Sequence, residues 1–501
     1  MSRSIRRPDN HPKTFIGKYI LESISLGMYD HPLMAIREYV QNSADAIDEL
    51  AHQETNITSG RGLIDITLDG RTRSVRLKDN GIGVPSDKAY SVLHDLGRSE
   101  KDPLKNRGFR GIGRLGGLGY CKELRFVTKA EGEETESTST WDCERLTHLV
   151  NDRSGSLDTT SVVQQVTAFR QERYSGDVHD HFFNVEMNNV RCSRDMLLNV
   201  PLVKAYLSQV APVAFSPSSF CFADEIDNEL RRQVPTYQTY DIHLNGEAIY
   251  KPYCGSVRVS DHGSEEVGSI KLFTLSEDSN LLAVGWMGEL ELLGTIQPST
   301  LADGLRVRSG NIMVGDKNLL ADFYRERRFN NYLMGEIHVV DTRLTPNSRR
   351  DDFEDNATRD HFYTCFLKEI GIPYSVKIRQ KSKERSAAKV LGDAKVLRQR
   401  AERIIECGYL AELQKQEISK RLVLLGESEN DVLMKKYTEG LVQMVLDSRH
   451  VMEKQNGHFS RSNVDLCKRI FETIYAEASS GVQAEALLEK AFNCLIAPRP
   501  A

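Results

Sequence analysis

The chain has 501 residues, of which 40% are hydrophobic and 27% charged, so it can form about three domains with cores of their own. Its net charge of −5 argues against a chain that coats nucleic acid, and its nine cysteines include no C-x-x-C pair that would indicate a zinc or thioredoxin-type site. No apolar run approaches the roughly 20 residues that span a bilayer, and none follows the basic N-terminus to form a signal peptide. We therefore expect a soluble, cytoplasmic protein.

Helical and strand patterns predict three regions. Residues 1–195 are rich in glycine and predict an α/β domain, residues 196–375 predict an α+β domain, and residues 376–501 predict an all-helical region. The predicted strands are Leu63–Leu68, Ser74–Lys78, Leu124–Lys129, His181–Met187, Ser256–Val259, Ser269–Thr274 and Gly335–Val340. A turn at Asp69-Gly70 joins the first two strands. Ala130–Asp158 is acidic and rich in Ser and Thr, and it is predicted to be a loop.

The first motif is a predicted helix over Leu33–Leu50. Its apolar stripe is made of Ile36, Val40, Ala44 and Ile47. Glu38, Asn42 and Asp45 are spaced by four and three residues, so they share the opposite side. On its own, this pattern is that of an ordinary surface helix.

The second motif, DNGIG at Asp79–Gly83, follows directly on a predicted strand. It is either a common hairpin turn or a carboxylate, Asp79, that can face an adenine amino group from a strand end. In the second case Gly81 and Gly83 would let the backbone approach the ligand.

The third motif is the glycine cluster RGFRGIGRLGGLGY at Arg107–Tyr120, in which Gly108, Gly111 and Gly113 fit G-x-x-G-x-G. Dinucleotide-binding folds use a similar pattern directly after a strand, but no strand pattern precedes it here. The cluster is either a flexible loop or a loop whose backbone N–H groups meet a phosphate. Its three arginines favour the phosphate.

Together and in this order, the three motifs resemble the GHKL superfamily of gyrase-type topoisomerases, heat-shock-90 chaperones, histidine kinases and MutL, with MORC proteins as relatives. The resemblance implies a Bergerat-fold ATPase domain that binds ATP and Mg²⁺, a lid at Gly108–Gly113, Glu38 as the general base and Asn42 as the magnesium ligand. The nucleotide-binding residues that it implies are Asn42, Asp45, Asp79, Gly81, Gly83, Ser99, Lys101, Gly108, Gly111 and Gly113.

The chain departs from the family at the last strand of this domain. A Gly-Thr pair is expected to open that strand, but the sequence has HDHFF at His179–Phe183. The Thr159-Thr160 pair is a candidate substitute.

The resemblance continues at LTPNSRRD, Leu344–Asp351. Similar loops in the chaperones carry Asn-x-Ser-Arg-acid, which makes Arg350 the catalytic cation that reaches the γ-phosphate from a transducer-like or middle-like second domain, with Arg349 as the alternative. A cation on a closing domain can stabilise the charge that develops during phosphoryl transfer. The other interpretation is a solvated basic turn.

The leading hypothesis is a Mg²⁺-dependent ATPase that closes as a homodimer, most similar to heat-shock-90 chaperones, with a helical region that dimerises or binds a client. A histidine kinase is set aside because the residues before Leu33 provide no phosphoacceptor helix pair. A non-hydrolysing nucleotide switch is a further alternative, and Glu38 argues against it.

The other alternative is a MORC- or MutL-like clamp that acts on DNA. Between Lys377 and Arg403, ten Lys or Arg side chains accompany three Asp or Glu, a local net charge of +7. Such a run is either a solvated helix face or a contact with nucleic acid.

Overall fold

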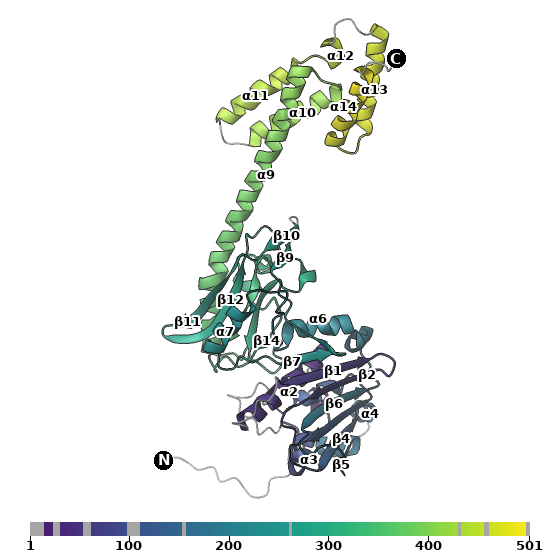
Figure 1. Ribbon diagram of the computed structural model, residues 1–501, viewed down its shortest axis with the longest axis vertical. Coiled ribbons are helices and arrows are strands. Elements are labelled where there is room, and N and C mark those ends of the chain that lie inside the picture. The colour runs from purple at the N-terminus through teal and green to yellow at the C-terminus, as the bar shows by residue number, and fades with distance from the viewer. Residues whose placement is uncertain are drawn as a thin grey trace. The chain divides into compact units, whose positions relative to one another are not determined.

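A computed structural model describes residues 15–23, 31–53, 62–97, 111–152, 157–259, 263–428, 432–454 and 460–496. The chain divides into two compact units, Met1–Arg379 and Gln380–Ala501, and each is described by itself (Figure 1). The first unit contains two large β-sheets and a two-stranded one, and the second unit is helical, which confirms the predicted mixture of α/β structure with a helical C-terminal region.

The first sheet has eight strands in the order β5-β4-β3-β6-β2-β1-β7-β8. They are β1 (Leu63–Asp69), β2 (Ser74–Asp79), β3 (Glu123–Lys129), β4 (Thr135–Asp142), β5 (Thr167–Arg173), β6 (Phe182–Asn188), β7 (Asp241–Leu244) and β8 (Glu247–Ala248). The predicted hairpin is confirmed: β1 and β2 pair antiparallel, and the Asp69 carboxylate accepts hydrogen bonds from the backbone N–H groups of Arg71 and Thr72 in the turn.

Helices cover one face of this sheet. They are α1 (Tyr19–Leu21), α2 (Leu33–Gln53), α3 (Ser86–His94), α4 (Cys143–Asn151), α5 (Thr159–Val166) and α6 (Val200–Val210), with the short turns η2 (Gly113–Gly117) and η3 (Ser193–Leu198). Alternate strand residues such as Ile66 and Leu77 enter a core with Ile36 and Val40 of α2. The opposite face carries charged side chains, among which Arg125 pairs with Glu186.

The prediction of a loop over Ala130–Asp158 was wrong, because this segment contains β4 and α4. The sequence TESTSTWD of β4 looks like a loop by composition, yet Ser137, Thr138 and Ser139 are buried within the sheet. Small hydroxyl side chains can be buried in a strand when the polar groups find partners, and the Ser139 hydroxyl lies 3.3 Å from Nε2 of His94.

The second sheet has the order β11-β12-β15-β13-β14, and β9 and β10 form a separate pair. The strands of this sheet are β11 (Ser269–Glu277), β12 (Asn280–Glu289), β13 (Gly304–Ser309), β14 (Ile312–Val314) and β15 (Met334–Val339), and the separate pair is β9 (Ser256–Val259) with β10 (Gly263–Glu266). The same region contains the helices α7 (Ala223–Gln233) and α8 (Ala357–Phe366), the short turns η4 (Pro298–Thr300), η5 (Ala321–Phe323) and η6 (Arg327–Tyr332), and the π-helical segment η7 (Leu367–Gly371). The three strands predicted here are confirmed. Trp286, Ile337 and Phe362 lie in its core.

Two elements that follow the predicted boundary between residues 195 and 196 belong to the first sheet and its core. Helix α6 contributes Val203 and Leu207 to the core of the first sheet. Strand β7 pairs parallel with β1, so the first sheet ends with residues that follow α7 in the chain. The division into an N-terminal and a middle-like domain remains a prediction, and the first sheet extends beyond its proposed limit.

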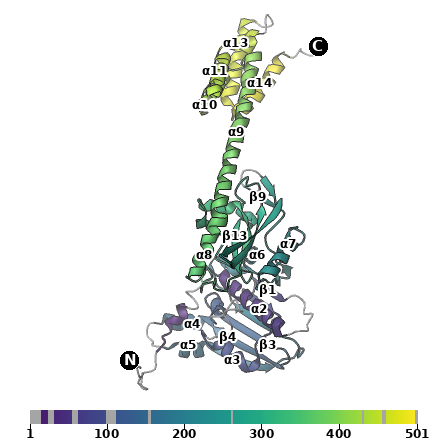
Figure 2. The ribbon, with the colours of Figure 1, turned by 90° about the vertical axis from the view of Figure 1, so that its left-hand side faces the viewer.

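The helical region consists of α9 (Ile372–Cys407), α10 (Glu412–Ser428), α11 (Val432–Leu446), α12 (Val451–Lys454), α13 (Arg461–Glu477) and α14 (Gly481–Ile496). Figure 2 shows α10, α11, α13 and α14 packed together within this unit. Ile418 and Val445 belong to one of its small cores, and Phe471 and Leu488 to another. Among the helices in the described residues, none is both long and apolar enough to cross a membrane.

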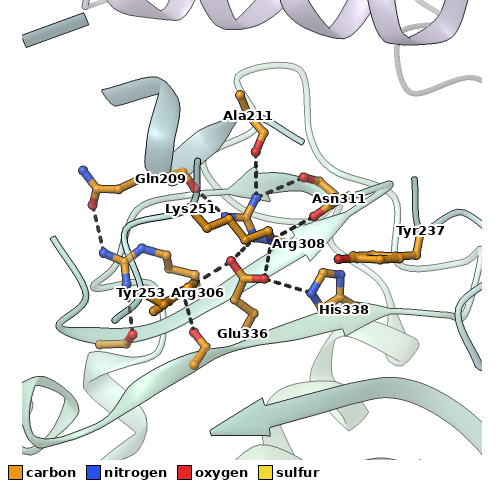
Figure 3. A network of polar contacts seen from close by, with 12 residues as sticks. Gln209, Ala211, Tyr237, Lys251, Tyr253, Arg306, Arg308, Asn311, Glu336 and His338 are labelled. Carbon is orange, nitrogen blue, oxygen red and sulfur yellow. Dashed lines mark hydrogen bonds and ion pairs between the residues drawn. The ribbon is translucent and has the colours of Figure 1, made fainter. Parts of the chain in front are cut away.

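A buried carboxylate, that of Glu336 on β15, organises the polar interior of the second sheet (Figure 3). Lys251 Nζ and Arg308 Nε each donate to it at 2.6 Å, and His338 Nε2 lies 3.2 Å from it. Burial opposes ionisation of Glu336, but the charges of Arg308 and Lys251 hold its pKa well below the usual value. Burial, together with the nearby charge of Arg308, lowers the pKa of Lys251 to about 7.

The same network reaches the end of α6 (Figure 3). Arg308 donates from Nη2 to the Gln209 carbonyl at 2.7 Å and from Nη1 to the Ala211 carbonyl at 3.3 Å. The neighbouring Arg306 donates to Gln209 Oε1 at 2.9 Å. The last carbonyl groups of a helix need partners outside it, and here Arg308 of β13 provides them, while Arg306 holds the Gln209 side chain.

The buried His338 predicts a pH dependence of stability. Its neighbours are Glu336, Lys251, Arg308 and the Tyr237 ring, and burial lowers the pKa of His338 to about 4 from its usual 6.5. Between these two pH values the unfolded chain takes up a proton that the folded chain does not bind. Acidification from pH 6.5 to pH 4 should therefore lower the free energy of unfolding by up to about 3 kcal/mol through this residue.

His338→Gln should lose this part of the pH dependence, whereas His148→Gln, at an exposed position on α4, should keep it. Urea unfolding followed by the fluorescence of the two buried tryptophans, Trp141 and Trp286, measures the effect. Equal pH dependence in the wild-type chain and His338→Gln would contradict the prediction.

Candidate functional site

The polar side of α2 is covered rather than exposed. The predicted apolar stripe lies in the core as expected. Asp45 is buried, Glu38 is only 8% exposed, and Asn42 is half-buried. Carboxylates are rarely buried without partners, so their burial on this helix distinguishes α2 from an ordinary surface helix.

Asp79 lies at the end of β2 and is 2% exposed. Ser43 of α2 donates its hydroxyl proton to Oδ2 at 2.6 Å, and the backbone N–H of Gly81 donates to Oδ1 at 3.0 Å. These charge-assisted bonds fix the carboxylate against α2. Ser43 is not among the site residues predicted from the sequence, although it stands next to Asn42 in the motif.

The glycines after Asp79 are required by close packing. A Cβ at Gly83 would lie 2.0 Å from the Lys129 carbonyl oxygen, and φ of Gly83 is +71°, a value that favours glycine. A Cβ at Gly81 would lie 2.7 Å from that of Ala46 on α2. These contacts fix the loop between α2 and β3, whatever it binds.

Phe183 lies opposite Asp79 in the register of β2 and β6, where the family pattern predicts a threonine nearby. On the next strand, Thr128 is paired with Phe183, and its hydroxyl accepts from the Val84 N–H at 2.9 Å. The candidate substitute Thr159 instead donates to the carbonyls of residues 16 and 17. The structure therefore places Thr128, not Thr159, in the same row as Asp79.

His181 also contacts this loop, because its Nδ1 lies 2.8 Å from the Gly81 carbonyl oxygen. In the sequence this histidine belongs to the HDHFF segment, which does not match the family pattern. Its position directly before β6 explains the contact, since β6 pairs with β2 and brings residue 181 next to the loop after Asp79.

The glycine cluster is described in part. Ser99, Lys101 and Gly108 lie outside the described residues. Gly111 has φ of +70°, and Gly113 begins η2 so close to α2 that a Cβ there would be 2.8 Å from Glu38 Oε2. The third motif thus meets the first at the carboxylate of Glu38.

Arg37 links the other oxygen of Glu38 to the second sheet region. Its Nη2 lies 3.4 Å from Glu38 Oε1 and donates to the Arg349 carbonyl at 3.0 Å. The predicted arginine loop therefore meets α2 beside the predicted general base. Within that loop Arg349 is exposed, while Arg350 is buried and has φ of +55°.

Known proteins resemble this region. Residues 29–172 match the family described as "Histidine kinase-, DNA gyrase B-, and HSP90-like ATPase". The match includes all three motifs and ends before the arginine loop. The resemblance to the GHKL superfamily is thereby confirmed over these residues.

Three named relatives match at 24–33% identity, two of them named as chaperone proteins and one as a heat shock protein. "Chaperone protein HtpG" of Psychrobacter cryohalolentis is 24% identical over 178 residues, which are 31% of this chain and 26% of that protein. The protein of the same name from Chlorobium phaeobacteroides is 33% identical over 87 residues, 16% of this chain and 14% of the other. "Heat shock protein 75 kDa, mitochondrial" of Bos taurus is 24% identical over 124 residues, 23% of this chain and 17% of the other. The chain thus spans about a quarter or less of the curated relatives it matches.

Proposed function

We propose that this chain, whose residues 29–172 form a GHKL-type ATPase domain, binds ATP with Mg²⁺ and hydrolyses it in a chaperone-like cycle. The observation that carries the proposal is the meeting of three motifs that are far apart in sequence. Ser43 of α2 is bonded to Asp79 at the end of β2, and Gly113 of η2 lies against Glu38 of the same helix.

Asp79 is suited to hold an adenine amino group. Its carboxylate accepts hydrogen bonds from the Ser43 hydroxyl and the Gly81 N–H, which hold the negative charge in place at the end of β2. The ring of Phe183 beside it offers an apolar surface to a base. The fixed carboxylate would distinguish an amino group, which donates, from a carbonyl group, which does not.

Asn42 fits the magnesium site implied by the family. Within the described residues no group of three or more His, Cys, Asp or Glu side chains could hold a metal ion. Mg²⁺ needs few protein ligands, because it takes most of its ligands from phosphate oxygens and water, so the amide oxygen of Asn42 suffices as a protein contribution. When bound, the ion would neutralise charge on the phosphates.

Glu38 is suited to act as the general base. Arg37 lies beside Oε1, and this leaves Oε2, on the side of Gly113, to take a proton from the attacking water. Arg350, or its exposed neighbour Arg349, would bring a cation to the terminal phosphate, since their loop is already bonded to Arg37. The proposal further includes that the chain forms a homodimer, acts on a client protein and lies in the cytoplasm. These three points stay predictions.

A DNA-binding clamp is the second candidate because of the basic residues of α9. Four of them have carboxylate partners: Arg379 with Glu326, Arg398 with Glu402, Arg400 with Glu485 and Arg403 with Glu489. Lys383, Lys389 and Lys395 are exposed. Retention on DNA that falls steeply with salt would favour the clamp over the chaperone-like ATPase.

Asp79→Asn should weaken ATP binding at least tenfold. The change removes a charge-assisted hydrogen bond worth ~1.5–3 kcal/mol, and about 1.4 kcal/mol is a factor of ten in affinity. Ser43→Ala is the matched control, because it removes one donor to the carboxylate and keeps the charge, so it should cost less. Calorimetric titration with ATP and Mg²⁺ compares them. A folded Asp79→Asn protein with wild-type affinity would rule out this role.

Glu38→Gln should reduce turnover by ~10²-fold or more, because a general base acts in the transition state. ATP affinity should change by no more than about threefold, since the ground state does not need the base. Glu49→Gln, at an exposed position on the same helix, is the control. Turnover measured by phosphate release at the wild-type rate in Glu38→Gln would mean that another group activates the water.

Arg350→Ala should lower turnover by ~10³-fold with a modest change in ATP affinity, as expected for a cation that acts on the transition state. Arg350→Lys keeps a positive charge at this buried position. Comparing it with Arg350→Ala therefore separates the effect of losing the charge from the effect of disturbing the fold. Arg349→Ala tests the neighbour, and a larger fall there would assign the role to Arg349. If both alanine variants keep wild-type turnover, this loop supplies no catalytic cation.

A further inference from the structure

Tyr39, the residue after Glu38, connects α2 to η2 through its hydroxyl group. The side chain is 2% exposed. Its oxygen accepts a hydrogen bond from the backbone N–H of Gly117 at 2.8 Å and donates one to the Arg114 carbonyl at 3.2 Å. A Cβ at Gly117 would lie 2.4 Å from this oxygen, so the close approach requires a glycine. One hydroxyl thus holds two backbone groups of the turn.

The turn that Tyr39 holds is the one that faces Glu38. Gly113 at its start is so close to Glu38 that an added Cβ would be 2.8 Å from Oε2. The side chain of Arg114 also donates to the Gly111 carbonyl at 2.7 Å and to the Asp95 carbonyl. The backbone from residue 111 to residue 117 is therefore tied to itself by Arg114 and to α2 by Tyr39.

We propose that Tyr39 is a positioning residue for ATP hydrolysis: its hydroxyl fixes η2 relative to Glu38. The inference rests on the proposed ATPase function. In the proposed function Glu38 activates the attacking water and the glycine loop that leads into η2 meets the phosphate, so the position of η2 relative to Glu38 would set the distance between water and phosphate. Since Glu38 and Tyr39 are consecutive on one rigid helix, the hydroxyl fixes this distance directly. An error of about 1 Å in such a distance can lower a rate by ~10²-fold.

The hydroxyl can be separated from the ring by substitution. The ring belongs to the core of the first sheet, and phenylalanine would fill the same volume. Tyr240 offers a matched comparison, because it is also buried and donates its hydroxyl to Asp48 of α2 at 2.5 Å. Asp48 lies ten residues after Glu38, more than two helical turns along α2. Tyr240→Phe therefore removes a buried hydroxyl contact with the same helix at a position away from Glu38.

The experiment compares Tyr39→Phe and Tyr240→Phe with the wild-type full-length chain. In Tyr39→Phe, kcat should fall on the order of tenfold while KM for ATP changes less than about twofold, because the loss lies in the placement of reacting groups. Tyr240→Phe should keep the wild-type kcat. Without nucleotide, the amide hydrogen of Gly117 should exchange faster in Tyr39→Phe than in the other two proteins. Thermal unfolding shows whether both variants are folded.

The outcomes separate this inference from the proposed function. A wild-type chain that does not hydrolyse ATP would overturn the proposed function, and the inference with it. Hydrolysis by the wild-type chain with an equal kcat in Tyr39→Phe would overturn the inference alone. An equal fall in kcat for both variants would also overturn the inference. The loss of any buried hydroxyl bond to α2 would then lower kcat, whether or not that bond holds η2.

Discussion

Arg308 joins three parts of the first unit through one guanidinium group. It donates to Glu336 on the neighbouring strand and to the carbonyls of Gln209 and Ala211 at the end of α6. Because Arg308 and Glu336 are both buried, removing either partner would leave an uncompensated charge, at a cost of about 3–5 kcal/mol. The end of α6 is therefore held against the second sheet. Helix α6 also packs against α2, so the network that holds α6 supports the helix that carries the predicted general base, Glu38.

The first sheet and its helices show which parts of this fold can be predicted from the sequence. The β1–β2 hairpin and α2 were predicted because apolar residues recur in them with the period of a strand or a helix. Strand β4 was missed because its buried residues, apart from Trp141, are Ser and Thr, and the Ser139 hydroxyl finds a polar partner inside the domain. The pairing of β7 with β1 was missed because residues so far apart leave no local pattern.

The candidate site was predicted as a set of motifs, and the structure adds their contacts. Glu38, Asp79 and Gly113 were each named from local patterns, and they meet around α2. Ser43 and Tyr39 were missed, since each acts through one hydroxyl on a group distant in sequence. Gly81 and Gly83 were selected for the approach of a ligand, whereas the structure gives them a second reason, the close packing of their loop on α2 and β3.

The parallel pairing of β7 with β1 also affects how the chain can fold during synthesis. Strand β1 begins at Leu63 and β7 ends at Leu244, so the edge of the first sheet is completed only after the intervening residues have been made. At about 5–20 residues per second, ribosomes need on the order of ten to forty seconds for this stretch. During that time β1 has an unpaired edge, and edges of this kind promote association with other chains. A nascent chain of this protein is therefore most prone to aggregation before residue 244 emerges.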